Sequence, residues 1–287
     1  MSLSIRTNVG SLNAQNNLNK TQNLLDSSMS KLSSGMRITK AGDDAAGLGI
    51  SVNLEAQIRS YNQAARNAND GLSMIQTAEA ALNSTTNILT RLRELAMQAA
   101  SDGVGTTDRV NIQAEVTQLV SELDRNATAA EYNGTKLLNT TGTSLDFQIG
   151  IRNITANDRI SVSTVNVTAS TLGIVNLGGF GVTASNFADV TNGKINAQNA
   201  LTTIDTALNS ISANRATFGA VGNRFDSVIQ NIQTFAEQLS AANSRIRDVD
   251  VAQETSNLSR AQILAQAGVS VLGQANQLPQ MALKLLG

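Results

Sequence analysis

The sequence predicts a mainly α-helical protein, a long antiparallel helical coiled-coil rod with a small β-hairpin insert, whose N- and C-terminal helices pair. Three observations predict this fold. Apolar residues recur every seven positions at both ends of the chain, the single proline, Pro279, leaves long stretches free to be helical, and β-branched residues, Thr, Gly and Asn are concentrated at about 139–193. Because seven-residue spacing places side chains on one face of a helix, each end needs a partner helix.

The two ends of the chain carry the clearest periodicity. Neither end can bury its apolar face alone, so we expect the two to pack against each other and against further copies of the chain. This predicts a terminal coiled-coil domain made of residues 1–42 and 250–287. The residues expected to mediate polymerisation, here called the terminal seam, are Leu18, Leu25, Met29, Leu32, Val251, Leu258, Ala265 and Leu272.

Residues 43–249 are predicted to form a helical rod domain. Asp43 and Asp44 precede an Ala-rich run, which indicates the capped start of a helix that extends to about Ala100, roughly 85 Å at ~1.5 Å per residue. Asp108 is expected to cap a shorter helix. The segment from Phe225 to Val249 fills every position of an apolar seam, so we expect it to pack along the long helix as a coiled coil.

The β-rich insert lies at about 139–193. Leu145, Phe147, Ile149 and Ile151 alternate with other residues, and Ile160 and Val162 begin a second short apolar set, which predicts one or two β-hairpins. Asn133-Gly134 is expected to end the preceding helix with a turn, and the glycines at 178–181 to form a turn or bulge.

Composition excludes several classes of function. The chain has no Cys and no His, so it lacks thiolate chemistry, the usual general base and the commonest zinc ligand. A net charge of −1 argues against nucleic-acid binding, and no apolar run is long enough for a membrane span. We therefore expect no enzyme activity, no metal and no cofactor. The first thirty residues lack an apolar signal core, which by ordinary rules predicts a cytoplasmic protein.

Two local patterns invite a functional interpretation. Ser28 and Lys31 have the spacing of a Ser/Lys nucleophile pair, but a polar helix face explains them better. The segment 89–97 places two Arg and a Glu between Leu residues, with the Leu side chains expected to be exposed. Its chemistry fits a solvated face with Arg91–Glu94 pairing and a protein-contact patch equally well.

Several motifs resemble those of the bacterial flagellins and occur in the same order along the chain. They cover roughly residues 1–140 and 200–287. Gly222 departs from the family, in which a larger polar residue is more usual. The helix that contains Gly222 is therefore expected to start later or to bend there. The matching motifs are LSSGMRI at 32–38, AGDDAAGLGIS at 41–51, RNANDGLSMIQTAEAALN at 66–83, RLRELAMQAA at 91–100, YNGTKLL at 132–138, SRIRDVDVAQETSNLSRAQILAQAG at 244–268 and QANQLPQMALKLLG at 274–287.

The resemblance implies a structural subunit that polymerises into the flagellar filament, in a minimal form without large outer domains. The terminal helices would line an inner tube and residues 43–249 would form the outer-tube rod. It also implies a secreted, extracellular protein that leaves unfolded through the flagellar type III apparatus, with an export chaperone, a filament cap and hook-junction proteins as partners. The alternative within this resemblance is the hook–filament junction protein.

The resemblance implies one further partner, the host Toll-like receptor five. In the flagellins that this receptor recognises, a helix and a Glu on the next helix make the main contact. The matching positions in this sequence are Arg91, Leu95 and Glu115. The same surface would lie between subunits in the filament, so that only monomers would be recognised.

Overall fold

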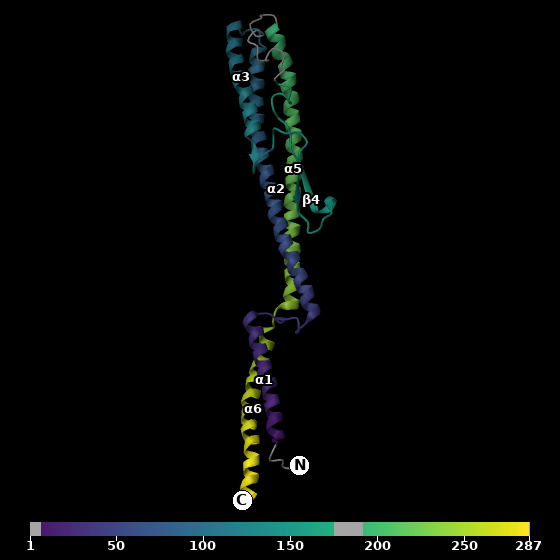
Figure 1. The fold of residues 1–287 in the computed structure, drawn as a ribbon. Coiled ribbons are helices and arrows are strands. Elements are labelled where there is room, and N and C mark those ends of the chain that lie inside the picture. The colour runs from purple at the N-terminus through teal and green to yellow at the C-terminus, as the bar shows by residue number, and fades with distance from the viewer. Residues whose placement is uncertain (1–6, 175–191, 287) are drawn as a thin grey trace. The chain divides into compact units, whose positions relative to one another are not determined.

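A computed structural model describes residues 7–174 and 192–286 of the chain, which is drawn in Figure 1. The chain divides into two compact units, residues Met1–Ile58 with Glu237–Gly287 and residues Arg59–Ala236. The elements are α1 Val9–Ser34, α2 Ala45–Ala99, α3 Thr106–Ala129, β1 Glu131–Tyr132, β2 Thr135–Lys136, β3 Ser144–Gln148, α4 Thr155–Asp158, β4 Arg159–Ser163, α5 Asn192–Arg247 and α6 Val251–Leu286. Helices α2 and α5 contribute residues to both units.

In the first unit α1 and α6 lie side by side, as Figure 1 shows. The Asn8 side chain caps the start of α1 and also donates from Nδ2 to the carbonyl oxygen of Ala275 at 2.8 Å. Leu18 packs so closely on Gly268 that a Cβ at Gly268 would lie 3.2 Å from the Leu18 Cδ1 atom. The predicted pairing of the terminal helices is therefore confirmed.

The ends of α1 and α5 are tied together within the same unit. Gly35 ends α1 in the left-handed conformation, with φ 71°, which glycine adopts without steric cost. The backbone N–H of Arg37 donates to the Arg247 carbonyl at 2.6 Å, and that of Val249 donates to the Gly35 carbonyl at 3.0 Å. The Arg37 guanidinium also donates to the Ile246 carbonyl, at 3.2 Å from Nε and 2.7 Å from Nη2.

Asp43 and Asp44 have separate roles. Asp44 Oδ1 accepts from the Gly47 N–H at 2.8 Å and so caps α2, as expected. Asp43 instead closes the preceding turn, because its Oδ2 accepts from the N–H of Thr39 at 3.1 Å and that of Lys40 at 3.2 Å. The backbone hydrogen bond from Thr39 is the largest cause that lowers the pKa of Asp43.

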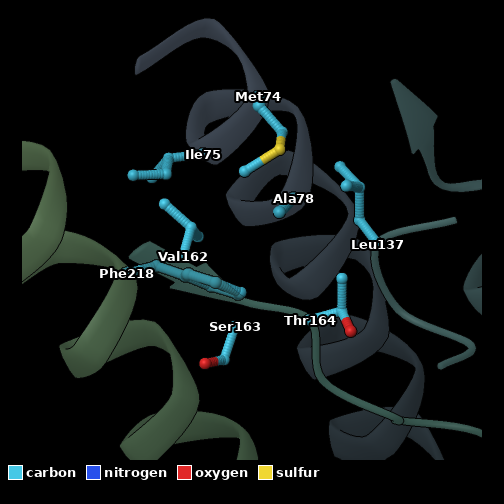
Figure 2. Close-up of a pocket in the computed structure, with 8 residues that line it drawn as sticks. All are labelled: Met74, Ile75, Ala78, Leu137, Val162, Ser163, Thr164 and Phe218. Carbon is cyan, nitrogen blue, oxygen red and sulfur yellow. The ribbon is translucent and has the colours of Figure 1, made fainter. Parts of the chain in front are cut away.

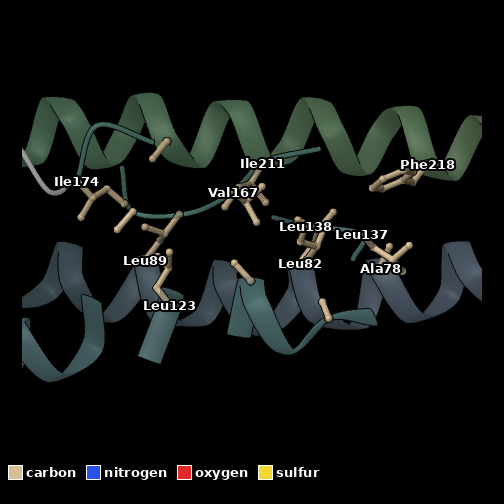
Figure 3. Packing of buried hydrophobic residues seen from close by; sticks show 14 of the residues in the cluster. Ala78, Leu82, Leu89, Leu123, Leu137, Leu138, Val167, Ile174, Ile211 and Phe218 are labelled. Carbon is tan, nitrogen blue, oxygen red and sulfur yellow. The ribbon is translucent and has the colours of Figure 1, made fainter. Parts of the chain in front are cut away.

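The second unit contains the main hydrophobic core, enclosed by α2, α3, α5 and the hairpins. Figure 3 shows Leu82 and Leu89 of α2 facing the same cluster as Leu123 of α3 and Ile211 of α5. Leu92 and Leu95 of α2 also belong to this cluster. The expected cap at Asp108 is wrong: α3 begins after Gly105, which makes no side-chain cap, and Asp108 lies inside the first turn, where its charge favours the helix N-terminus.

Two antiparallel hairpins follow α3. The β3–β4 hairpin pairs Leu145 with Val162 and Phe147 with Ile160, as the alternation predicted. The β1–β2 hairpin was not predicted. Asn133 and Gly134 do not end the helix but form the two-residue loop of this hairpin, with φ 47° and 78°, the positive values that a type I′ turn requires. The predicted turn or bulge at 178–181 lies outside the described residues.

Strand β4 packs onto the helices through Val162. In Figure 2, Val162 points toward Ile75 of α2 and Phe218 of α5. The packing there leaves a void of ≈ 10 Å³, with mostly apolar walls. This anchoring fixes the hairpin on the pair of long helices.

The apolar seam predicted from Phe225 to Val249 is covered over only part of its length. Phe225 is fully buried and Ile232 is 4% exposed, whereas Phe235 is 50% exposed even though its ring lies 5.9 Å from that of Tyr61. Of the two expectations for Gly222, a late start of this helix is wrong, since α5 begins at Asn192 and continues through that position, and a bend there stays a prediction.

Candidate functional site

The terminal seam is incompletely covered by the pairing of α1 with α6. Met29 and Val251 are exposed, at 55% and 59%. The other six seam residues are half-buried, because each helix covers only one side of its partner. The half-buried residues are Leu18, Leu25, Leu32, Leu258, Ala265 and Leu272.

A second apolar surface on the same two helices was not identified from the sequence. Its residues lie outside the seven-residue rows that predicted the seam, so the periodicity did not mark them as contact residues. Large exposed apolar side chains at this density are typical of a protein-contact surface. They are Val9, Leu12, Leu24, Ile263, Leu264, Val269 and Val271, each between 49% and 66% exposed.

A groove of ≈ 320 Å³ lies between α1 and α6 beside two of these residues, Leu24 and Leu264. Leu24 and Leu264 form apolar walls, and Lys31, Glu254 and Arg260 contribute charges. Ser28 also lines it and is 6% exposed, but among the described residues no hydrogen bond joins it to Lys31. The arrangement therefore suits the packing of another apolar helix better than nucleophilic chemistry.

Arg91 links two helices of the second unit at the surface. Its Nη2 atom lies 2.8 Å from Glu115 Oε1 on α3, and its Nη1 atom lies 3.0 Å from Glu94 Oε2 on α2. The hydrogen bond to Glu115 is the largest cause that raises the pKa of Arg91. With Arg91 and Glu115 side chains 50% and 45% exposed, the pair presents both signs of charge to solvent.

Leu95 does not share that surface. It is 2% exposed and belongs to the core, as do Leu89 and Leu92, so the expectation that exposed Leu side chains flank the arginines is wrong. The exposed apolar residue in this segment is Met97, at 55%. The structure thus brings Arg91 and Glu115 together on the surface and places Leu95 in the core, where its role is packing.

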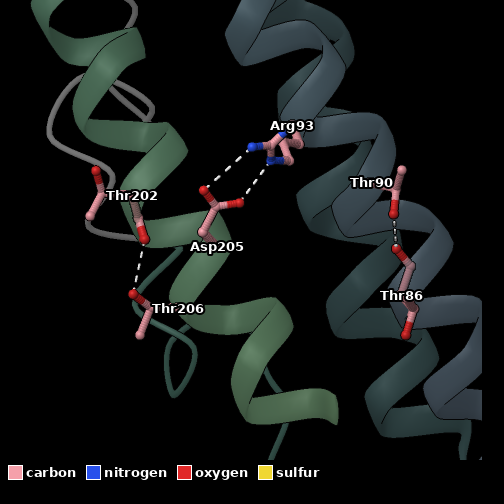
Figure 4. A network of polar contacts seen from close by, with 6 residues as sticks. All are labelled: Thr86, Thr90, Arg93, Thr202, Asp205 and Thr206. Carbon is pink, nitrogen blue, oxygen red and sulfur yellow. Dashed lines mark hydrogen bonds and ion pairs between the residues drawn. The ribbon is translucent and has the colours of Figure 1, made fainter.

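Arg93, two residues after Arg91, pairs across to α5. Its Nε atom donates to Asp205 Oδ1 at 2.7 Å, as Figure 4 shows, while the Thr90 and Thr206 hydroxyls in the same view donate to the backbone of their own helices. This hydrogen bond is the largest cause that lowers the pKa of Asp205. Sequence alone could not find the pair, because its members are 112 positions apart.

Neither a metal cluster nor a membrane-spanning helix is found in the described part of the chain. In residues 7–174 and 192–286, no three His, Cys, Asp or Glu side chains are grouped as metal ligands would be. None of the helices in those ranges combines the length and apolar character that a bilayer span requires.

Comparison with known proteins gives matches over nearly the whole chain. The bacterial flagellin N-terminal helical region matches residues 5–143 and the bacterial flagellin C-terminal helical region matches residues 201–286. A flagellin of Bacillus subtilis is 42% identical and the flagellar filament 33 kDa core protein of Treponema phagedenis is 40% identical, and each match covers 98% of this chain and 99% of the relative.

One protein of known structure with a similar fold is described as a hook-associated protein and not as a flagellin. A putative flagellar hook-associated protein from Vibrio parahaemolyticus superposes with a TM-score of 0.61 at 14% identity, over 72% of this chain and 100% of the other. At that identity the likeness concerns the fold alone.

Proposed function

The chain belongs to the bacterial flagellin family and is a structural, non-enzymatic subunit of the flagellar filament, and from this premise we propose that α1 and α6 are the elements through which copies polymerise. The terminal domain so assigned comprises residues 1–42 and 250–287, and residues 43–249 form the rod. In the filament the α1–α6 pairs of neighbouring copies pack together around its inner tube.

The exposed apolar surface of α1 and α6 is the observation that carries this proposal. Ile263 is 66% exposed and Leu24 is 60% exposed. Complete burial of a fully exposed side chain of this kind contributes about 1.5–3 kcal/mol, so burying the exposed part of each contributes a share of that amount to assembly. The groove beside Leu24 and Leu264 provides a complementary depression for a neighbour's side chains.

Substitution of these exposed residues tests the proposal. Ile263→Asp and Val269→Asp should raise the critical concentration for seeded polymerisation by at least about tenfold, since each places a charge in a dry contact. The monomer should keep its circular dichroism spectrum, because both side chains are more than half exposed. Gln262→Glu, which adds a charge at an exposed polar position, serves as the matched control, and normal assembly of both Asp variants would contradict the proposal.

The route out of the cell follows from the same premise. We expect export of the unfolded chain through the flagellar type III apparatus, with a cytoplasmic chaperone on the apolar face of α6 and folding under the filament cap, next to the hook-junction proteins. The absence of Cys supports this route, because no disulfide can form before threading. Deleting residues 250–287 should abolish chaperone binding, which isothermal titration with the purified chaperone would measure.

A second proposed role is recognition of the monomer by host Toll-like receptor five through Arg91 and Glu115. The observation that favours it is the exposed pair of opposite charges on two adjacent helices, 2.8 Å apart. Arg is among the residues that most often dominate protein interfaces. Leu95 is buried, so in this proposal it supports the contact only by packing α2 into the core and does not touch the receptor.

The receptor proposal is tested with monomers. Arg91→Asp should weaken receptor signalling by about tenfold or more, because it places like charges beside Glu94 and Glu115 and removes the cation. Arg125→Asp on α3, another exposed arginine that pairs with a glutamate, is the matched control. Equal signalling by both variants would exclude the assignment.

The hook–filament junction protein remains the competing function within the same fold. The full-length relatives with filament names support the filament subunit over this alternative. Electron microscopy of the purified protein after seeding decides between them, since a junction protein would form no long filaments.

A further inference from the structure

A cleft of ≈ 600 Å³ opens in the second unit between α2 and the two hairpins. Buried or half-buried aromatic and apolar side chains line part of it, and the rest is polar, with two exposed carboxylates. Openings of this size accommodate several side chains of a partner. The lining includes Met74, Tyr132, Leu145 and Phe147 with the carboxylates of Asp70 and Asp146.

The two carboxylates lack a cationic partner among the described residues, unlike most acidic groups of this unit. Glu79 pairs with Arg215, and Asp205 with Arg93. Among the described residues, by contrast, Asp70 has no hydrogen bond or ion pair, and Asp146 accepts only from the Ser144 hydroxyl, at 3.4 Å. Carboxylates beside aromatic rings form a favourable environment for a guanidinium group, which both can attract.

A complementary cation lies on α5. Arg224 is exposed and has no side-chain partner in the described part of the chain. Its position is rigid, because the next residue, Phe225, is fully buried against Phe147 in an edge-on contact of 5.7 Å between ring centroids. Arg152, the other exposed arginine of the unit without a side-chain partner in the described part of the chain, lies in the loop after β3.

Helical geometry places Asp70 and Arg224 on opposite flanks at the same level. A Cβ at Gly222 would lie 3.9 Å from Leu72, so these two positions mark where α5 and α2 face each other. Two residues correspond to about 200° around a helix with 3.6 residues per turn. Asp70 therefore faces away from α5, and Arg224 faces away from α2.

We propose that this cleft binds Arg224 of a neighbouring copy, so that copies associate side by side through the second unit. The inference rests on the chain being a filament subunit and adds a specific lateral contact to the assembly through α1 and α6. A site on one flank and its ligand on the other make a heterologous contact, which continues from copy to copy as a helical array requires. The guanidinium lies between the carboxylates of Asp70 and Asp146, over the aromatic wall.

Seeded polymerisation of the full-length protein tests the contact by charge removal and charge exchange. Asp70→Asn with Asp146→Asn, and separately Arg224→Gln, should each raise the critical concentration by about tenfold, as expected for a close interfacial charge pair. Asp70→Arg combined with Arg224→Asp should recover assembly relative to either reversal alone. Arg152→Gln, the matched control, should assemble as the wild type does.

The outcomes separate the two levels of the proposal. If the wild-type chain fails to polymerise, the assembly function itself fails. If the wild type polymerises but the Asn and Gln variants assemble equally well, or if charge exchange recovers nothing, the lateral contact is overturned while the assembly function stands. Thermal melting of each monomer guards against misfolding: variants that melt as the wild type does report on the contact alone.

Discussion

Arg93 and Asp205 join α2 to α5 by a hydrogen-bonded ion pair of 2.7 Å in which both side chains stay about half exposed, at 45% and 48%. The pair lowers the pKa of Asp205, chiefly through the hydrogen bond from Arg93, and raises that of Arg93. The pKa of Asp205 is lower in the folded state than in the unfolded state. The pair therefore makes its full contribution to stability at pH values above the ordinary aspartate pKa, and this contribution is lost as pH falls through the folded-state pKa.

Asp205→Asn should therefore lower the melting temperature slightly at pH 7, and the difference from the wild type should shrink as pH falls below the ordinary aspartate range and the wild-type carboxylate becomes protonated. Solvent screening keeps the effect small, as for other exposed ion pairs. Thermal melts followed by circular dichroism between pH 2 and 7, in steps of about one unit, would check it. A difference that does not shrink as pH falls would show that the substitution acts by another route.

Gly222→Ala should stabilise the fold by about 0.5–1 kcal/mol, because alanine loses less conformational entropy in a helix than glycine. The new Cβ has room, since its nearest neighbours on Ile75 and Leu72 would lie at 3.9 Å. Urea denaturation would measure the change.

Gly71→Ala is the matched control for that substitution, and it should destabilise by about 1–3 kcal/mol through overpacking. A Cβ at Gly71 would lie 2.6 Å from the Phe225 ring and 3.2 Å from Phe147. Phe225 is fully buried, so its ring cannot move aside without disturbing the core. Equal effects of the two glycine substitutions would refute the packing argument.

Arg109→Ala should destabilise the second unit by about 1–3 kcal/mol, because it leaves two backbone carbonyls near the end of α2 without their donor. Arg109 is only 4% exposed, and it donates to the carbonyl of Ala99 at 3.0 Å and to that of Ser101 at 2.9 Å. Chemical denaturation would show the loss. Arg66→Ala, at an exposed position bonded only to Gln63, should have little effect and serves as the comparison.

Leu95→Ala should cost about 2–5 kcal/mol, as other truncations of fully buried leucines do. Its effect on receptor signalling should follow the fraction of unfolded protein, whereas Arg91→Ala should alter signalling without a matching fall in melting temperature. Measuring both properties on both variants separates packing from contact. A Leu95→Ala variant that melts normally but signals weakly would restore Leu95 as a direct contact.

The helices of this fold were largely predictable because their apolar periodicity extends over many turns. In the sequence of α2 the apolar residues fall into two adjacent rows at helical spacing, one of which contains Leu92 and Leu95, and two adjacent rows indicate burial on more than one side. The interpretation of the same segment as exposed was wrong because α3, which helps to cover this face, leaves no mark on the sequence of α2 itself.

Short-range features were less predictable for a different reason. Asn133-Gly134 fits a helix end and a two-residue hairpin loop equally well, and the choice depends on strands only two residues long. The role of Asp108 depended on where the helix begins, which sequence locates to within a few residues. Ion pairs such as Arg93–Asp205, and the carboxylates that line the cleft, can be identified only from the tertiary arrangement.

The pairing of α1 with α6 also sets an order of events in time. Helices α2 to α5 lie between α1 and α6 in the sequence, so α1 has no helical partner until α6 has been synthesised. Contacts of such large sequence separation form slowly, because the loop between them must close first. The α1–α6 pair is thereby expected to form late: a chain that lacks α6 could fold its central part but could not form this pair.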